Sequence, residues 1–231
     1  MQLKLLSGGA AQALVGAVAA RFKAETRFDI DGAFGAVGAM KGRLLGGEPA
    51  DLLILTRALI DELAAGGHVE ADSVADIGAV RTAIAVRAAD PAPPVGNGDD
   101  LRRALRAADA IYSPDQKLST AGIHFAKVLD ALAITGEVAS RLRTFPNGAA
   151  AMSALAASAE RQPIGCTQVT EILGIPGLTL VGVLPPDFEL ATVYTVGVAT
   201  RAAHPDAARK LAAMLTSAEA LPLREQVGFG R

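Results

Sequence analysis

The sequence predicts an α/β fold in which mainly parallel strands alternate with helices. Apolar segments of strand length are separated by segments with helical periodicity, the order typical of successive strand–helix–strand units. The run 52–55 (Leu-Leu-Ile-Leu) is wholly apolar, as expected for a parallel strand with helices on both faces. Glycine-bearing turns lie where the first two expected strands lead into helices, at 7–10 and at 34–38.

The first third of the chain repeats this strand–helix order. Leu14, Val18 and Phe22 are spaced by four residues, which places them on one face of an expected helix. Gly46-Gly47 and Gly66-Gly67 follow two further helical segments and are typical of helix ends. The expected strands are 3–6, 29–34 and 52–55, and the expected helices are 10–23, 40–45 and 57–65.

The remainder of the chain continues the alternation. Thr120 is the expected N-cap of a helix whose inward face carries Phe125, Leu129 and Leu132. The tight pair Asn147-Gly148 is expected to open another helix. The expected strands are 82–86, 110–112, 164–166, 178–184 and 192–200, and the expected helices are 99–108, 120–132, 136–142, 147–159, 169–173, 204–215 and 217–227.

The composition excludes several classes of partner. With 22 basic and 24 acidic residues the net charge is −2, and the chain has no tryptophan, so it offers neither a basic face nor stacking platforms for nucleic acid. Cys166 is the sole cysteine, which excludes an internal disulfide, and we expect it to pack in the core. The three histidines are scattered without metal-ligand spacing, so no metal and no cofactor is expected.

The lengths of the apolar runs and the start of the sequence bear on membrane insertion and on the cellular compartment. No run of eighteen or more apolar residues occurs, so no membrane insertion is expected. The chain starts almost directly on its first strand without a leader. As written, the sequence therefore predicts a cytoplasmic protein, or a periplasmic one if a leader has been removed.

The two early glycine turns predict an anion site. At Ser7-Gly8-Gly9-Ala10 and at Gly35-Ala36-Val37, main-chain N–H groups at a helix start lack intrahelical acceptors and the helix dipole adds positive potential. The dinucleotide fingerprint is missing, because Gly8-Gly9 lacks its third glycine and no acidic residue closes the next strand. A small anion is therefore favoured over a dinucleotide.

Four segments carry a resemblance to a known family. They are 47–54 (GEPADLLI), 120–126 (TAGIHFA), 163–166 (PIGC) and the closing pair Gly228-Phe229. In this order they resemble the type II periplasmic binding proteins, and within these the molybdate-binding proteins of ABC transporters. The resemblance implies two α/β lobes, each a mainly parallel sheet flanked by helices, joined by two hinge strands near 81–87 and 193–199. Lobe 1 would be 1–82 plus 195–231, and lobe 2 would be 83–194.

The resemblance also implies where a ligand binds. In that family a tetrahedral oxyanion is held between the lobes by main-chain amides and by hydroxyl groups, whose positions fall here on Ala10, on 36–38 and on Gln168. All three hydroxyls are missing, whereas the amide of Gln168 can donate to a carboxylate, so an organic carboxylate is favoured over molybdate. The candidate ligand-binding residues are Ser7, Gly8, Gly9, Ala10, Gly35, Ala36, Val37, Thr120, Ala121, Gly122, Asn147, Gly148, Thr167 and Gln168.

Two functions remain open. The first is a binding protein that closes on a small anion and presents it to an ABC-transporter membrane component. The second is an isomerase of a small unsaturated polycarboxylate on the same fold, similar to aconitate isomerase, in which Asp115, His124 or Glu171 would move the proton. Binding is favoured, and no residue is assigned as catalytic. Around the site, Tyr112, Asp115 and Lys117 are candidates to face the ligand, and Lys41 and Arg57 to reach a second carboxylate.

Overall fold

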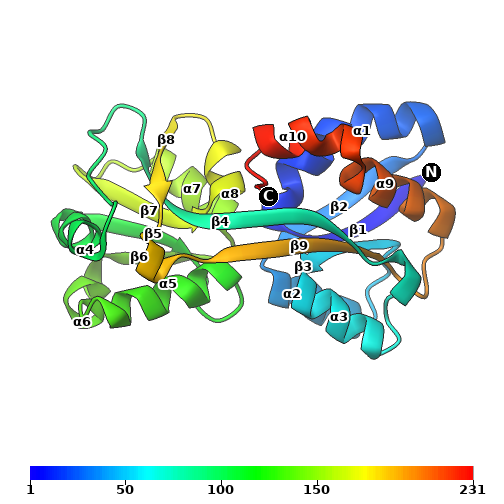
Figure 1. Ribbon diagram of the computed structural model, residues 1–231, viewed down its shortest axis with the longest axis horizontal. Coiled ribbons are helices and arrows are strands. Elements are labelled where there is room, and N and C mark those ends of the chain that lie inside the picture. The colour runs from blue at the N-terminus through cyan, green and yellow to red at the C-terminus, as the bar shows by residue number, and fades with distance from the viewer. Residues whose placement is uncertain (231) are drawn as a thin grey trace. The chain divides into compact units, whose positions relative to one another are not determined.

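The computed structural model describes residues 1–230 and divides into two compact units (Figure 1). Unit 1 comprises Met1–Ala79 with Thr192–Arg231, and unit 2 comprises Val80–Ala191. The chain passes between them inside β4 (Ala75–Arg87) and returns inside β9 (Ala191–Val198). These crossings lie three residues before the expected ones, at 79 against 82 and at 191 against 194. That the two units act as separate lobes remains a prediction.

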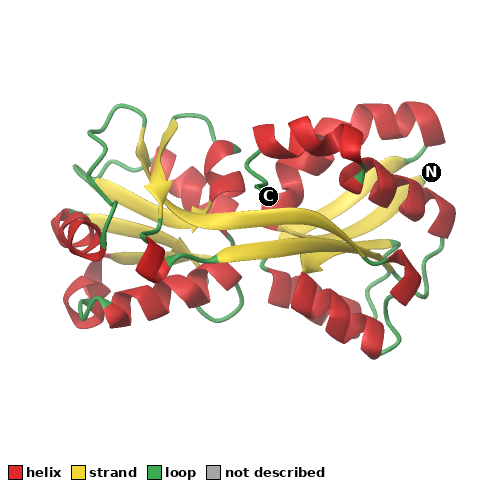
Figure 2. Ribbon diagram, in the orientation of Figure 1, coloured by secondary structure: helices red, strands yellow, loops and turns green. Residues whose placement is uncertain are grey.

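Unit 1 is built on a sheet of the order β2-β1-β3-β9. Strands β1 (Gln2–Gly8), β2 (Asp29–Gly35) and β3 (Leu52–Thr56) are parallel, and β9 runs antiparallel to β3. Helices α1, α9 and α10 cover one face of this sheet and α2 and α3 the other (Figures 1 and 2). The helical elements are η1 (Gly9–Ala11), α1 (Gln12–Thr26), α2 (Val37–Leu45), α3 (Arg57–Ala65), η2 (Ala71–Ser73), α9 (Pro205–Thr216), η5 (Ala218–Ala220) and α10 (Leu221–Gln226).

The core of unit 1 follows the apolar pattern of the sequence. Leu14, Val18 and Phe22 of α1 are buried, as their spacing predicts. The four apolar residues 52–55 of β3 are all fully buried. Because a central parallel strand is covered on both faces, neither of its side-chain rows reaches water.

Unit 2 is built on a sheet of the order β4-β7-β5-β6, with β8 (Leu178–Val183) pairing antiparallel to β4. Strands β5 (Ala110–Pro114), β6 (Leu142–Phe145) and β7 (Pro163–Gln168) are parallel, and β4 is antiparallel to β7. The helical elements are α4 (Gly98–Ala107), α5 (Thr120–Ala131), α6 (Thr135–Val138), η3 (Ala139–Arg141), α7 (Gly148–Ala156), α8 (Val169–Leu173) and η4 (Pro186–Phe188).

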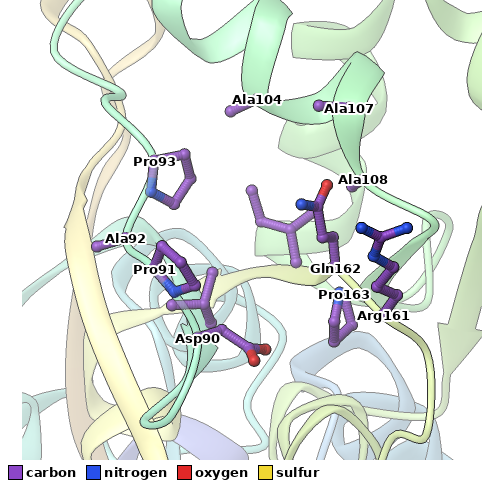
Figure 3. Close-up of a pocket in the computed structure, with 12 residues that line it drawn as sticks. Asp90, Pro91, Ala92, Pro93, Ala104, Ala107, Ala108, Arg161, Gln162 and Pro163 are labelled. Atoms are coloured by element: carbon purple, nitrogen blue, oxygen red, sulfur yellow. The ribbon is translucent and has the colours of Figure 1, made fainter.

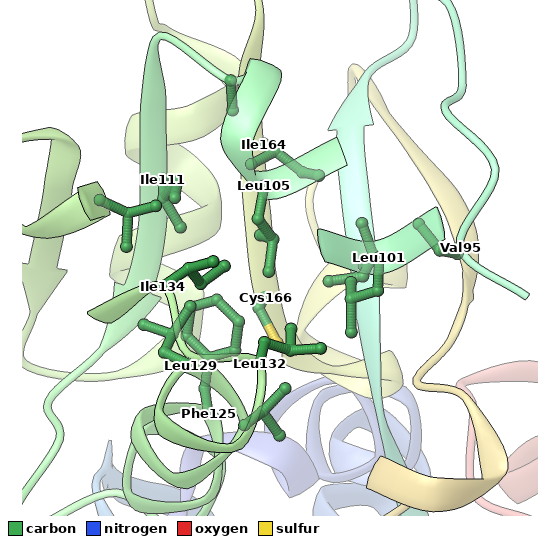
Figure 4. Packing of buried hydrophobic residues seen from close by; sticks show 14 of the residues in the cluster. Val95, Leu101, Leu105, Ile111, Phe125, Leu129, Leu132, Ile134, Ile164 and Cys166 are labelled. Carbon is green, nitrogen blue, oxygen red and sulfur yellow. The ribbon is translucent and has the colours of Figure 1, made fainter. Parts of the chain in front are cut away.

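Two apolar clusters lie on the two faces of the unit 2 sheet. On one face α4 and α5 pack over Ile84, Ile111 and Cys166, as Figure 4 shows around the cysteine sulfur. On the other face Met152 and Leu155 of α7 pack over small residues of the strands. Burial raises the pKa of the Cys166 thiol far above its usual range, which keeps it an uncharged core side chain. The prediction that Cys166 packs in the core is confirmed.

Four local predictions are wrong. Residues 142–145 form strand β6, whereas the expected helix extended to 142. Strand β4 begins seven residues before the expected start, at 75 against 82, and α2 begins at 37 against 40. The N-cap of α5 is Ser119, so Thr120 is already helical. β6 has two exposed polar residues and depends on pairing with β5, a tertiary contact that local periodicity does not register.

No helix within residues 1–230 is both long enough and apolar enough to cross a bilayer.

The packing of α5 gives a test of the fold. Phe125→Ala is expected to lower the free energy of unfolding by about 3–5 kcal/mol, because a large, fully buried ring is replaced by a cavity. Ile123→Ala on the same helix is the matched control: Ile123 is 37% exposed, and its truncation should cost less than about 1 kcal/mol. Urea unfolding measures both, and equal losses would contradict the packing described.

Candidate functional site

Helix α5 has an open N-terminus at the carboxyl end of β5. Its first main-chain bond runs from the N–H of Ile123 to the carbonyl of Ser119, and no side chain caps the helix. The N–H groups of Thr120, Ala121 and Gly122 therefore have no acceptor among residues 1–230. With the dipole of a twelve-residue helix behind them, these three donors form a position suited to an anion.

The turn before α5 is held rigidly by its own contacts. The carboxylate of Asp115 accepts hydrogen bonds from the N–H groups of Lys117 (2.7 Å) and Leu118 (2.8 Å), and the N–H of Ser119 donates to the Asp115 carbonyl. Gly122 packs against the same carbonyl so closely that a Cβ would lie 2.1 Å from its oxygen. Glycine at 122 thus fixes the helix start against the turn, and the Asp115 carboxylate has a structural use.

Buried hydroxyl groups lie on the sheet face beneath α5. Side chains alternate along a strand, so Ser113, Thr82 and Gln168 share the face of Ile111, Ile84 and Cys166, which α5 covers. Ser113 is fully buried and its Oγ has no hydrogen-bond partner; the same holds for Oγ1 of Thr82, which pairs with Gln168 across β4 and β7. Unpaired buried hydroxyls are uncommon in folded proteins and call for a ligand or water partner.

Sequence reasoning missed Ser113 and Thr82. Thr82 is the first residue of the expected strand 82–86, and Ser113 directly follows the expected strand 110–112. The signal that could have found them is positional, since polar residues at the ends of neighbouring apolar strands converge on one sheet edge.

The N-terminus of α7 is capped by a side chain, whereas that of α5 is not. The side chain of Asn147 accepts from the N–H of Ala150 (2.8 Å), and its carbonyl accepts from Ala151. Gly148 lies directly against the carboxyl group of Glu171, and the N–H groups of Gly148 and Ala149 lower the pKa of that carboxyl. The donors predicted at 147–148 are therefore already used inside the protein.

The Glu171 carboxyl is embedded in unit 2. Glu171 is only 8% exposed, and the hydroxyl of Thr167 donates to its Oε2 over 2.6 Å. A Cβ on Gly148 would lie 1.9 Å from that oxygen, so this close approach requires glycine. Burial raises the pKa of Glu171 above its usual value, although the hydroxyl of Thr167 and the N–H groups of Gln168, Gly148 and Ala149 act in the opposite direction.

Unit 1 also has an open helix N-terminus, at α2. Its first main-chain bond runs from Met40 N–H to the Ala36 carbonyl and no side chain caps it, which leaves the N–H groups of 37–39 without acceptors in the described chain. Gly35 lies against Met40, whose Cε would be 2.9 Å from an added Cβ. The predicted residues Gly35, Ala36 and Val37 thus do form a helix start with unpaired donors.

The earlier turn, 7–10, is more fully used by the protein. The hydroxyl of Ser7 donates to the Gly8 carbonyl over 2.9 Å, so it neither caps the helix nor remains available as a donor. A Cβ on Gly8 would lie 2.7 Å from the ring of Tyr194 and 2.8 Å from Val37. Gly8 therefore serves packing within unit 1, and Ala10 is buried beside it.

Several neighbours have roles other than the expected ones. Tyr112 is buried, stacks on Phe145 and donates to the hydroxyl of Ser158 over 3.0 Å, so the expectation that it faces a ligand is wrong. His124 Nε2 donates to the Phe188 carbonyl over 2.7 Å. Lys41 and Arg57, the candidates to reach a second carboxylate, form ion pairs within unit 1 instead. Lys41 pairs with Glu62 and Arg57 with Asp76.

A separate hollow of about 260 Å³ lies at the opposite edge of the unit 2 sheet, where β5 and β7 begin (Figure 3). Proline and alanine side chains form most of its wall, including Pro91, Pro93 and Ala104, with Arg161 and Gln162 at one side. It contains none of the open helix N-termini. Within residues 1–230 no cluster of histidine, cysteine and acidic side chains is arranged to hold a metal ion.

Comparison with known sequences places the chain in a family. The sequence profile described as "Bacterial extracellular solute-binding protein" matches residues 3–230, almost the whole chain. The chain belongs to this family of bacterial extracellular solute-binding proteins.

Relatives within and around this family extend the comparison. An aconitate isomerase of a Pseudomonas species is 29% identical over 233 residues, which cover 98% of this chain and 87% of that protein. The periplasmic molybdate-binding protein of Azotobacter vinelandii matches with a TM-score of 0.81 at 14% identity, over 99% of both chains. The sulfate-binding protein SubI of Mycobacterium tuberculosis matches with a TM-score of 0.75 at 19% identity, over 99% of this chain and 86% of that one. The two structures confirm the two-lobed periplasmic-binding-protein fold.

The buried carboxyl gives this solute-binding protein a defined pH response. Glu171 has a raised pKa in the folded state, so the folded state holds its proton more tightly than the unfolded state. The contribution of Glu171 to the free energy of unfolding is therefore largest at low pH. It declines as the pH rises above about 4.3, the ordinary pKa of glutamate. Glu171→Gln should therefore gain stability relative to wild type as the pH rises from 4.5 towards 7.5.

Urea unfolding across that pH range measures the difference. Glu160→Gln, at an exposed position, is the matched control and should track the wild type at every pH. If the free energies of unfolding of wild type and Glu171→Gln differ by the same amount at every pH, the raised pKa of Glu171 is contradicted.

Proposed function

We propose that this protein binds a small organic carboxylate at the open N-terminus of α5. The N–H groups of Thr120, Ala121 and Gly122 would hold the carboxylate oxygens, with the dipole of α5 stabilising the charge. One observation carries the proposal: three unpaired main-chain donors lie at a helix start, on the sheet face that holds the buried, unpaired hydroxyl of Ser113. The open N-terminus of α2 in unit 1 is a second candidate position for an anionic group.

A carboxylate suits these donors better than a tetrahedral oxyanion does. An oxyanion such as molybdate presents four oxygens, and the hydroxyls expected to serve them are replaced at Ala10, at 36–38 and at Gln168. A carboxylate has two oxygens, which main-chain amides and an amide side chain can satisfy. The name of the Pseudomonas relative, aconitate isomerase, also favours a polycarboxylate.

Catalysis is the second candidate function, supported by that same relative. An isomerase must move a proton, so a basic side chain has to reach the substrate. The three candidate shuttles are engaged: Asp115 with its own turn, His124 with the Phe188 carbonyl, and Glu171 with α7. Binding alone therefore remains the favoured function, and no catalytic residue is assigned.

The family description bears on location and partner. An extracellular solute-binding protein works outside the cytoplasm, which favours a periplasmic location over a cytoplasmic one. We extend the proposal to delivery of the carboxylate to an ABC-transporter membrane component.

A thermal-shift screen tests the ligand class. Cis- and trans-aconitate, citrate and malonate are expected to raise the melting temperature, because a ligand that binds only the folded state stabilises it by mass action. Molybdate, tungstate and sulfate at the same ionic strength are expected to leave it unchanged. A shift with molybdate and none with the carboxylates would overturn the proposal.

Incubation of each carboxylate that binds, followed by NMR of the small molecule, separates the two functions. The unchanged ligand supports binding alone, whereas interconversion of cis- and trans-aconitate establishes the isomerase.

Ser113 provides a residue-level test of the same site. Ser113→Ala should leave the unliganded protein at least as stable, because it removes a buried hydroxyl without a partner. The affinity for the carboxylate should fall about tenfold, the loss expected for one hydrogen bond to a charged group. Ser153→Ala, at an exposed position of α7, is the control, and calorimetry measures the affinities. Unchanged affinity in Ser113→Ala would exclude this hydroxyl from the site.

A further inference from the structure

Helices α5 and α7 of unit 2 both begin at the carboxyl edge of its sheet, and their N-termini differ in one respect. At α5 the first three N–H groups have no acceptor in the described chain. At α7, a helix of nine residues, Asn147 accepts from the N–H groups of Ala150 and Ala151, and the Glu171 carboxyl lies directly against Gly148 at the helix start. The sequence suggests the same role for both starts, because each carries glycine in its first turn.

The Glu171 carboxyl has the environment of a bound anion. The hydroxyl of Thr167 donates to it, and it lies directly against Gly148 at the start of α7, the arrangement that holds anions at helix starts. No lysine, arginine or histidine forms an ion pair with it in the described chain. The Glu171 carboxyl is therefore stabilised by main-chain donors, the α7 dipole and one hydroxyl group, without an ion pair among residues 1–230.

The fit around this carboxyl is close. A Cβ added to Gly148 would lie only 1.9 Å from Oε2 of Glu171 and 2.2 Å from Oγ1 of Thr167. Glu171 belongs to α8, which follows β7 directly, and α7 follows β6. Strand β5 lies between β7 and β6, so the sheet holds the carboxyl and the start of α7 in a fixed relation. No room is left at the α7 start for an external carboxylate.

We propose that Glu171 is a specificity-determining residue, which fills the anion position of α7 with the protein's own carboxyl group and so limits unit 2 to one ligand carboxylate, at α5. This inference rests on the proposed function, because it concerns how many anionic groups of a ligand unit 2 can hold.

Chemical rescue tests the inference. Glu171→Ala vacates the position while leaving its donors in place, so acetate should bind there and raise the melting temperature of the variant. At acetate ten times above its dissociation constant the rise should be about 3 °C. Sodium chloride at equal ionic strength is the control for salt effects. Wild type and Glu171→Gln, whose α7 positions remain filled, should show only the smaller rise that acetate at α5 produces, and the rise should be the same in both.

The outcomes decide the inference separately from the proposed function. A folded Glu171→Ala whose melting temperature rises with acetate no more than that of wild type overturns it. If the variant folds poorly, acetate should restore its refolding yield and chloride should not; failure of acetate to do so also overturns it. Failure of the carboxylate screen in wild type would remove the proposed function, whereas acetate rescue would still establish α7 as a filled anion position.

Specificity is measured on the same variant. Relative to malonate, the affinity for tricarboxylates should rise at least tenfold in Glu171→Ala, because a second anion position has become available. An unchanged ratio would show that Glu171 has only a structural role.

Discussion

The main-chain N–H groups that open a helix need acceptors, and this requirement organises both units of the protein. Each parallel strand ends where a helix begins, so the carboxyl edge of each sheet collects unpaired donors. Asparagine caps two of these helices: Asn97 accepts from the N–H of Asp100 in α4, and Asn147 accepts from the N–H of Ala150 in α7, where the Glu171 carboxyl also lies against Gly148. The protein leaves the donors of α2 and α5 unsatisfied. The open starts of α2 and α5 are therefore the candidate positions for an anion.

Much of the fold could be predicted because it depends on local patterns. The apolar run 52–55 and the four-residue spacing in α1 report burial directly, and both segments are buried as expected. Strand β6 could not be predicted in this way, since its residues Leu-Arg-Thr-Phe are half exposed and are ordered by pairing with β5. Its existence depends on a partner outside the local sequence.

The candidate site was predictable only in part, for the same reason. Glycine-bearing helix starts are visible in the sequence, and α2 and α5 are indeed uncapped. Whether a start is open or closed depends on residues distant in the chain, as Glu171 is from Gly148. The unpaired hydroxyls of Ser113 and Thr82 become visible only when β5, β7 and β4 are placed side by side.

The state of Glu171 bears on the choice between binding and catalysis. A carboxyl with a raised pKa is a common general acid or base, so its presence at a sheet edge would ordinarily favour an enzyme. Here the carboxyl accepts from the hydroxyl of Thr167 and lies against the start of α7, and moving it would leave that buried hydroxyl without its partner. Such a group exchanges a proton with a substrate only if α7 releases it first. The geometry is that of a fixed structural anion, which is why the aconitate isomerase relative alone does not decide for catalysis.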